Sequence, residues 1–358
     1  MTKLRGALSQ IQGRFETEAR SPFDDGWAGE DQIDETFQTS VTEERARSII
    51  ARNDSPDIPF EQSINPYRGC EHGCIYCYAR PSHAYLELSP GLDFETKLFA
   101  KTNAVELLKA ELSRKGYVPK PIAFGANTDV YQPIERRYKV MRGLLEVLAA
   151  CDHPLTIVTK SALIERDIDL LARMAKKNLV KAFISITTLD HRLARTLEPR
   201  AASPQRRVDA LRALAGAGIP CGVMVAPLIP ALTDQSLEDV IQAAAKAGAT
   251  MAGWILLRLP NEVRPLFKEW LAAHYPQRAE HVISIVRQSR GGRENDPNFG
   301  SRMTGSGNFV DLIGKRFELA CKRLGLNSED NRDNQGASRD RLDCSLFRPP
   351  DEGQMQLF

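Results

Sequence analysis

Short apolar runs alternate with longer amphipathic stretches through the middle of this chain. The runs are rich in β-branched residues, which is typical of buried strands. They lie near residues 63–67, 121–126, 155–159, 182–187, 220–226 and 251–257. Apolar residues at helical spacing predict helices near residues 104–115, 136–149, 164–177, 204–217, 236–247 and 263–273. The pattern therefore predicts six successive strand–helix units.

Strands that alternate with helices in this way predict an α/β fold with a parallel sheet covered by helices. Ser203-Pro204 is a helix-start signal, and Gly218 and Gly248 stand where helices end. A closed eight-unit barrel takes about 250 residues, so six units favour a partial (β/α)6 TIM-like barrel. A doubly wound sheet is the alternative, which periodicity does not separate from the barrel. Both folds place their chemistry at the carboxyl ends of the strands.

The segments on either side of these units have another character. Residues 1–60 lack sustained periodicity and predict a polar, partly disordered N-terminal arm. Residues 61–285 form the predicted core, and residues 286–358 a C-terminal extension and tail. Residues 21–60 carry ten acidic and three basic side chains in a chain of net charge +2, so the remainder is basic. A basic body suits a polyanionic partner, although Lys and Arg that solvate helices explain it equally well.

Cysteine usage narrows the class of protein. Seven cysteines in 358 residues are too few for a disulfide scaffold, so we expect reduced thiols and a cytoplasmic location. No apolar run approaches the ~18–20 residues of a membrane span, and the N-terminus has no apolar core of a secretory signal. Three cysteines nevertheless lie within eight residues of one another: Cys70, Cys74 and Cys77.

The spacing of these three is Cys-x3-Cys-x2-Cys, on a loop that follows the first predicted strand. A loop of this length can wrap three thiolates around a four-iron four-sulfur (4Fe-4S) cluster, which usually takes four cysteines. The next cysteine is Cys151, so one iron would stay open to a non-protein ligand. The alternative is zinc, with His72 or His83 as a fourth ligand, in a non-enzymatic binding module.

The segment Cys70-x3-Cys74-Ile75-Tyr76-Cys77 resembles the signature of radical S-adenosylmethionine (SAM) enzymes, including the aromatic residue before the third cysteine. The resemblance covers about residues 61–285 and implies a partial (β/α)6 barrel. It also implies that SAM ligates the open iron and is cleaved reductively to a 5′-deoxyadenosyl radical, which abstracts hydrogen from a substrate. An electron donor such as flavodoxin or ferredoxin is implied as a partner.

Three longer segments are similar to a bacterial group related to spore photoproduct lyase, a DNA-repair enzyme. They begin at Asn65, Thr128 and Leu197 and run to residues 79, 135 and 200. This similarity makes a nucleic acid one candidate substrate. A peptide or a small molecule is the alternative substrate of the same radical chemistry.

The resemblance also implies SAM contacts at the ends of later strands. They would come from Asn127, Thr128 and Asp129 after the second strand, Ser185 and Thr187 on the fourth, Arg200 in a following loop, and Val225 and Ala226 on the fifth, together with Tyr76. Each has a structural alternative: a turn, backbone pairing, an ion pair with Glu198, or plain core packing. No catalytic residue is assigned.

Two further features point to the substrate side. Arg258 ends the sixth apolar run, where a charged residue either faces a ligand or extends to solvent. Residues 287–307 then combine four arginines with five glycines, which suits contacts to phosphate or a mobile, solvated loop.

Overall fold

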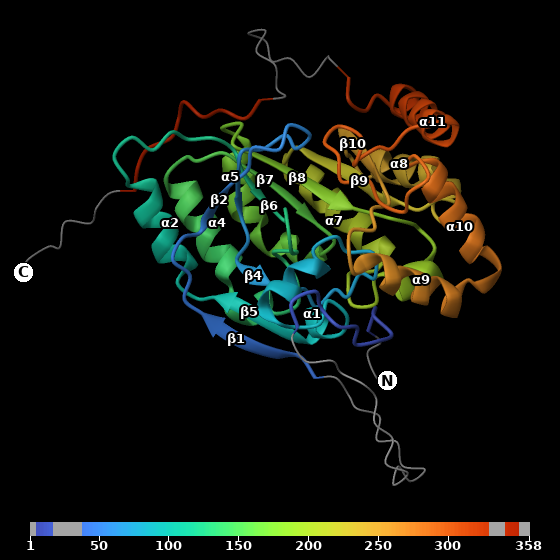
Figure 1. Ribbon diagram of the computed structural model, residues 1–358. Coiled ribbons are helices and arrows are strands. Elements are labelled where there is room, and N and C mark those ends of the chain that lie inside the picture. Colours follow the sequence, from blue (N-terminus) through green and yellow to red (C-terminus); the bar gives the residue numbers. More distant parts are fainter. Residues whose placement is uncertain (1–4, 17–37, 329–340, 351–358) are drawn as a thin grey trace, which may run out of the picture.

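The computed structural model describes residues 5–16, 38–328 and 341–350 (Figure 1). Its central sheet has the strand order β10–β9–β8–β7–β6–β3–β2, parallel throughout except that β2 runs antiparallel to β3. The strands are β2 (Ile50–Arg52), β3 (Gln62–Ile64), β6 (Ile122–Phe124), β7 (Leu155–Thr159), β8 (Val180–Ser185), β9 (Cys221–Leu228) and β10 (Met251–Leu256). The six parallel strands are the six predicted runs, which confirms that part of the sequence pattern.

The order of the parallel strands follows the chain without a reversal. A doubly wound sheet reverses its order at a switch point, whereas a barrel adds each strand beside the last one. β2 and β10 are the two edges of this sheet, so the barrel is open on one side. The fold is therefore the predicted partial barrel, and the doubly wound alternative is wrong.

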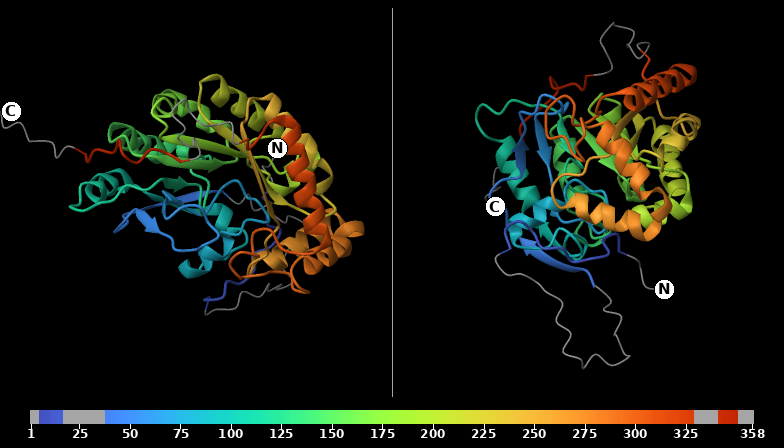
Figure 2. Two further views of the ribbon diagram at one scale, coloured as in Figure 1. Left: turned by 90° about the horizontal axis from the view of Figure 1, so that it is seen from above. Right: turned by 45° about the vertical axis from the view of Figure 1, so that its right-hand side comes forward.

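Helices form a layer along the outer face of the curved sheet (Figures 1 and 2). Neighbours in this layer contact one another in chain order, from α2 through α4 to α5 and from α7 through α8 to α11. The longer helices are α2 (Ala104–Leu112), α4 (Val140–Ala150), α5 (Ile168–Ala175), α7 (Pro204–Gly216), α8 (Leu237–Lys246), α9 (Val263–His274), α10 (Pro276–Gln288) and α11 (Asn308–Leu324). Shorter helical segments are α1 (Asp93–Thr96), α3 (Glu135–Tyr138), α6 (His191–Leu197) and the 3-10 turns η1 (Arg80–Leu86), η2 (Ala162–Asp167) and η3 (Asp234–Ser236).

Local signals set the ends of α7 and α8 as the sequence predicts. The Ser203 hydroxyl accepts a hydrogen bond from the Arg206 amide at 3.4 Å, and Pro204 is the first residue of α7. Gly218 and Gly248 follow α7 and α8 with φ of 74° and 98°, a conformation that glycine adopts without strain.

The predicted helix over residues 136–149 is interrupted near its start. Lys139 has a φ of 51°, which separates α3 from α4. The buried carboxylate of Glu135 accepts the amides of Met141 at 3.0 Å and Arg142 at 3.3 Å, so it caps the first turn of α4. Apolar spacing does not reveal such a break, which lies in the backbone conformation of Lys139.

A second sheet lies beside the first and was not predicted. It has the order β1–β5–β4, with β1 (Ser40–Glu44) parallel and β4 (Tyr67–Arg68) antiparallel to β5 (Lys97–Lys101). Two strands, β1 and β2, therefore form within the segment expected to be an irregular arm. The rest of that expectation falls partly on residues 17–37, which lie outside the described residues.

The C-terminal part of the chain adds to the barrel at two places. The boundary expected after residue 285 falls inside α10, while α11 packs against α8. Residues 341–350 contact the loops that precede β7 and β8, where the Asp343 amide bonds to the Asn178 carbonyl at 3.0 Å and the Arg348 amide to the Cys151 carbonyl at 2.9 Å. Among the residues described, no helix is both long enough and apolar enough to cross a bilayer.

Candidate active site

The three clustered cysteines lie on the loop between β4 and η1, beyond the carboxyl end of β3, the first barrel strand. Cys70 and Cys74 are buried, Cys77 is partly exposed, and all three are free thiols. The chain turns tightly at Gly73, where φ is 68° and an added Cβ would lie 2.6 Å from a carboxylate oxygen of Glu95. Only glycine fits at this position, which allows the loop to curl back between its first two cysteines.

The side chain of Gln132 holds the first part of this loop. Its amide nitrogen donates to the Gly69 carbonyl at 3.1 Å, and its amide oxygen accepts the Glu71 N–H at 2.9 Å. Gln132 has no solvent exposure. The two hydrogen bonds therefore fix the peptide groups on both sides of Cys70.

Arg80 holds the second part of the loop through hydrogen bonds to its backbone. Its guanidinium is fully buried and donates to the carbonyls of Cys74 at 2.9 Å and Gly73 at 3.2 Å. It also pairs with Glu95, whose carboxylate accepts the amides of Gly6 at 2.9 Å and Ala7 at 2.8 Å. The buried pair thus ties the N-terminal segment to the loop, and its remaining lone pairs and protons are satisfied.

A second buried ion pair lies beside Tyr76. The Tyr76 hydroxyl donates to Glu198, which also accepts the Thr187 hydroxyl at 2.7 Å and pairs with Arg207. Burial by itself would raise the pKa of Glu198, but the Arg207 and Lys160 charges lower this pKa to about 2. Glu198 is therefore an anion inside the protein, and it orders the aromatic residue between the last two cysteines.

Lys160 follows β7 and reaches the same place. Its ammonium lies 5.7 Å from the centre of the Tyr76 ring. Within the described residues no carboxylate forms an ion pair with it. The Lys160 charge nevertheless favours the thiolate form of Cys74 and the ionised form of Glu198. It is a cation at the carboxyl end of a barrel strand, beside the cysteine loop.

The cysteine thiols fit a metal cluster that displaces their protons. Burial raises the pKa of Cys74 to about 12 and raises that of Cys70 well above its usual range. Burial also raises the pKa of Cys77, although the backbone amides of Ala79 and Arg80 oppose the shift. Such thiols stay protonated until a metal binds them, because metal ligation requires the thiolate.

Each of the two histidines that a zinc site would use contacts another group through one of its ring nitrogens. His72 Nδ1 lies 3.4 Å from the Asp129 carboxylate, and His83 Nε2 lies 2.9 Å from the Lys97 carbonyl oxygen. In residues 5–16, 38–328 and 341–350, no group of three or more His, Cys, Asp or Glu side chains converges on a single metal position. In a 4Fe-4S cluster each cysteine binds a different iron, so convergence on one point is not required.

A family model matches the part of the chain that carries this loop. Residues 64–244 match the radical SAM superfamily, a span of more than half the chain that includes all three cysteines. The chain belongs to the radical SAM superfamily. Radical SAM enzymes use a 4Fe-4S cluster and SAM and need a reductant, and this protein is a radical SAM enzyme with those cofactors.

Two relatives from different organisms are similar to this chain over more than half of its length. An uncharacterised protein of Mycobacterium tuberculosis is 40% identical over 233 residues, which cover 64% of this chain and 68% of that protein. An uncharacterised protein of Methanocaldococcus jannaschii is 28% identical over 219 residues, 61% of this chain and 78% of its own length.

Among solved structures, spore photoproduct lyase has a similar fold. Its complex with dinucleoside spore photoproduct has a TM-score of 0.59 at 17% identity and covers 81% of this chain and 82% of the lyase. A double mutant of the lyase with bound AdoMet and dinucleoside spore photoproduct has a TM-score of 0.53 at 18% identity, covering 81% and 79%. At these identities the likeness concerns the fold.

Three of the predicted SAM contacts of this radical SAM enzyme meet at one place. The Thr187 hydroxyl lies 3.2 Å from the Tyr76 hydroxyl and 3.3 Å from the Ala226 carbonyl oxygen. The side chains come from the cysteine loop and from the ends of β8 and β9. The cysteine loop thus meets residues of β9 and of the end of β8 that lie more than a hundred positions later in the chain.

Three other predicted contacts bind the cysteine loop itself. The Thr128 hydroxyl donates to the Tyr67 carbonyl at 2.9 Å. The Asp129 carboxylate lies beside His72, and Arg200 pairs with Glu71. These three side chains therefore shape the loop that carries the cysteines.

Asp129 is the most strongly held of the three. Burial would raise the pKa of Asp129, but His72 and hydrogen bonds from the Lys160 amide and the Thr159 hydroxyl, both at 2.7 Å, lower it to about 2. Asp129 thus links the cysteine loop to the carboxyl end of β7.

The remaining predicted contacts have mainly backbone or packing roles here. The Asn127 amide bonds to the Asn65 side-chain oxygen at 3.1 Å, and the Ser185 carbonyl accepts a hydrogen bond from Arg207 at 3.0 Å. Val225 lies fully buried in the main core.

Gln132, Lys160 and Arg207 were not predicted from the sequence. Gln132 does lie inside the Thr128–Glu135 segment that resembles the lyase group, so a signal for it was present. Nothing local marks Lys160 or Arg207, because their partners Tyr76 and Glu198 come from other elements.

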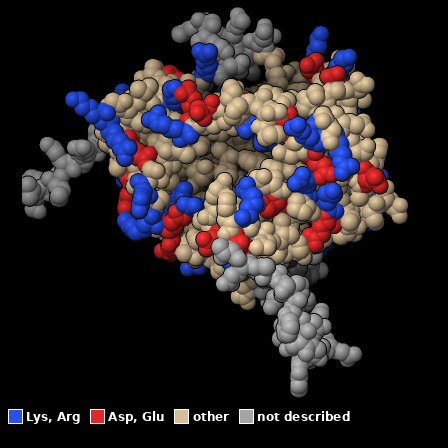
Figure 3. All heavy atoms as spheres, viewed as in Figure 1, with Lys and Arg blue, Asp and Glu red and all other residues tan. Residues whose placement is uncertain are grey.

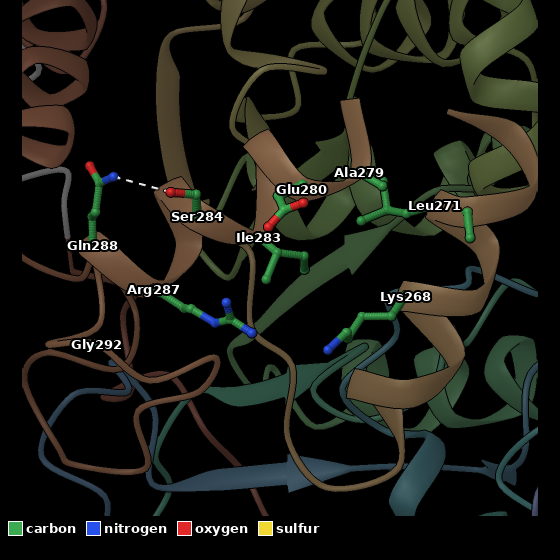
Figure 4. Close-up of a pocket in the computed structure, with 10 residues that line it drawn as sticks. Lys268, Leu271, Ala279, Glu280, Ile283, Ser284, Arg287, Gln288 and Gly292 are labelled. Atoms are coloured by element: carbon green, nitrogen blue, oxygen red, sulfur yellow. Dashed lines mark hydrogen bonds between the residues drawn. The ribbon is translucent and has the colours of Figure 1, made fainter. Parts of the chain in front are cut away.

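The surface has depressions at several places. In Figure 3 a hollow lies near the centre of the face seen in Figure 1, over the strands of the main sheet, with Lys and Arg side chains around it and Asp and Glu side chains among them. A separate groove of about 740 Å³ lies between α9 and α10, and Figure 4 shows Lys268 and Arg287 on its walls. None of the three cysteines lines this groove.

Proposed function

We propose that this enzyme cleaves SAM reductively at a 4Fe-4S cluster and uses the reaction to abstract hydrogen from a substrate. The observation that carries the proposal is that three free thiols, two of them buried, lie on one loop at the carboxyl end of the first barrel strand. Three thiolates leave one iron of a four-iron cluster without a protein ligand. When bound, the cluster supplies the single electron that breaks the carbon–sulfur bond of SAM.

The chain's own residues would bind and orient the cofactors. Cys70, Cys74 and Cys77 hold the cluster, and Lys160 pairs with the carboxylate of SAM because no carboxylate of the described residues forms an ion pair with its ammonium. Thr187 and the Ala226 carbonyl offer hydrogen bonds at the ends of β8 and β9, beside Tyr76. Burial of this region excludes water, which protects a radical from quenching.

The proposed electron donor is a flavodoxin or a ferredoxin, since the cluster needs a one-electron reductant. The proposed substrate is a nucleic acid. Support comes from the Lys and Arg side chains around the central hollow and from the net positive charge outside residues 21–60. Nucleic-acid binding should weaken steeply with salt, whereas a peptide or small-molecule substrate would leave DNA and RNA binding absent or insensitive to salt.

The test starts from anaerobically purified protein. We expect about four irons per chain, as a 4Fe-4S cluster requires, and formation of 5′-deoxyadenosine from SAM after reduction with dithionite. Cys74→Ala should lose iron and product, while Cys344→Ser, which alters a partly exposed cysteine in residues 341–350, should keep both. One stoichiometric zinc, or a loaded cluster that yields no 5′-deoxyadenosine with or without DNA, would refute the proposal.

A further inference from the structure

Arg258 differs from the other inward-facing arginines of this protein. Arg80 and Arg207 pair with buried carboxylates, and Arg290 donates to four backbone carbonyls. Among the described residues, Arg258 has one hydrogen bond, from Nη1 to the sulfur of Met303 at 3.5 Å, and sulfur is a weak acceptor. Its Nε is buried and has no hydrogen-bond partner in that part of the chain. A guanidinium has five N–H donors, so most of the binding capacity of Arg258 is unused.

The position of Arg258 places this unused capacity beside the cysteine loop. Arg258 follows the end of β10, and its guanidinium carbon lies 5.7 Å from the centre of the Tyr78 ring. Tyr78 directly follows Cys77, and its hydroxyl donates to the Ala126 carbonyl just beyond β6. The Arg258–Tyr78 contact therefore joins the last barrel strand to the cysteine loop at the mouth of the barrel.

The charge around Arg258 is positive. The charges of Arg302 and Arg290 repel that of Arg258, and Asp57 is a nearby carboxylate that attracts it. Asp57 is already bound by Arg302 through two hydrogen bonds of 2.7 and 2.6 Å.

Aromatic rings flank the same charges. Tyr78 is 46% exposed, and Phe299, which is 57% exposed, lies under the Arg302 guanidinium at 4.6 Å. Exposed aromatic rings interleaved with arginines suit a ligand that carries both an anion and a flat apolar ring, because bases stack on such rings while guanidinium groups bind phosphate.

We propose that Arg258 binds a phosphate group of a nucleotide unit in the substrate, with Tyr78 and Phe299 as the adjoining ring surfaces. The inference rests on the proposed function, since it places the substrate at the same barrel mouth. A phosphate takes two parallel N–H donors from one guanidinium, which is the capacity that Arg258 has free.

The test measures binding to the holoprotein under anaerobic conditions. The probes are a fluorescent thymidine octanucleotide, its uncharged methylphosphonate analogue and thymidine monophosphate. Arg258→Met keeps the length of the side chain and removes the charge, and Arg258→Lys keeps the charge without the fork. The control is Arg287→Met, which removes an arginine from the α9–α10 groove. Iron content and circular dichroism establish that each variant is folded.

We expect Arg258→Met to weaken octanucleotide binding about tenfold or more and to lower the slope of log Kd against log salt by about one. Arg258→Lys should recover part of the affinity, Arg287→Met should stay within about twofold of the unsubstituted protein, and the uncharged analogue should not respond to Arg258→Met. The same loss with thymidine monophosphate would identify a free nucleotide as the source of the phosphate.

Equal affinity and salt slope for Arg258→Met would overturn the inference, as would an equal loss for the uncharged analogue, which would reveal a packing effect. Absence of binding to every probe would also overturn it. None of these outcomes decides whether the enzyme cleaves SAM at a cluster, because formation of 5′-deoxyadenosine is measured separately and without these probes.

Discussion

The side-chain amide of Gln132 bridges the two peptide groups on either side of Cys70. One end donates to the Gly69 carbonyl and the other accepts the Glu71 amide. A glutamine that is fully buried, with both ends used, resists rotation of the backbone between them. Cys70 is thus presented in one orientation before any cluster is bound.

Substitution of Gln132 by Glu tests this relationship. The new carboxylate oxygen would face the Gly69 carbonyl without a donor, and a buried group left unsatisfied costs about 1–3 kcal/mol. We expect faster release of iron to a chelator and a shifted reduction potential of the cluster. Electron paramagnetic resonance of the reduced cluster measures that potential. Gln205→Glu, on the exposed side of α7, should match the unsubstituted protein. Unaltered iron release and potential in Gln132→Glu would contradict a positioning role.

Glu198→Gln should reduce stability strongly. The substitution leaves Arg207 buried without its carboxylate, and breaking a buried ion pair in this way costs about 3–5 kcal/mol. The free energy of unfolding from anaerobic urea titration measures the loss. Glu165→Gln breaks the more exposed pair with Arg206 and should cost less than about 1 kcal/mol. Equal free energies of unfolding for the two variants would contradict the larger cost expected from breaking the buried pair.

Lys160→Met should weaken SAM binding if Lys160 pairs with the SAM carboxylate. A charge-assisted hydrogen bond contributes about 1.5–3 kcal/mol, which predicts a rise in Kd of about tenfold or more. Equilibrium dialysis of labelled SAM against the iron-loaded protein measures it. Lys177→Met, which breaks a surface pair with Asp152, is the matched control. An unchanged SAM Kd in Lys160→Met would assign Lys160 to structure alone.

His153 should make stability depend on pH. Burial lowers the pKa of His153 to about 4, while Nε2 lies 2.8 Å from the Tyr117 hydroxyl. Because an unfolded His takes up its proton near its ordinary pKa of about 6.5, the unfolded chain binds more protons between that pH and 4. The stability due to neutral His153 is therefore complete above about pH 6.5 and declines as the pH falls.

From pH 7 to pH 5 this term amounts to about 2 kcal/mol, at about 1.4 kcal/mol per pH unit below 6.5. The measurement is the difference in unfolding free energy between the unsubstituted protein and His153→Gln at the two pH values. His191→Gln, at the exposed start of α6, should leave the pH dependence intact. Parallel pH profiles for the unsubstituted protein and His153→Gln would contradict the burial argument.

The sequence by itself determined the barrel strands, their helices and the cysteine loop. Each of these depends on residues that are close together in the sequence. Strands such as β7 are short runs rich in β-branched residues, α7 begins at Ser203-Pro204, and the ligand spacing of Cys70, Cys74 and Cys77 is a property of one short loop. The resemblance to radical SAM enzymes rested on that loop, and membership of the superfamily confirms it.

Only the tertiary structure decided which distant residues meet. β1 becomes a strand by pairing with β5, which lies more than fifty residues later, so its own polar sequence carries no strand pattern. Asp129 and Arg200 reach the cysteine loop, and Glu198 meets Arg207 and Tyr76, because the barrel brings the ends of its strands to one edge. Hydrogen bonds and ion pairs of this kind depend on distances in space, which neither periodicity nor spacing along the chain encodes.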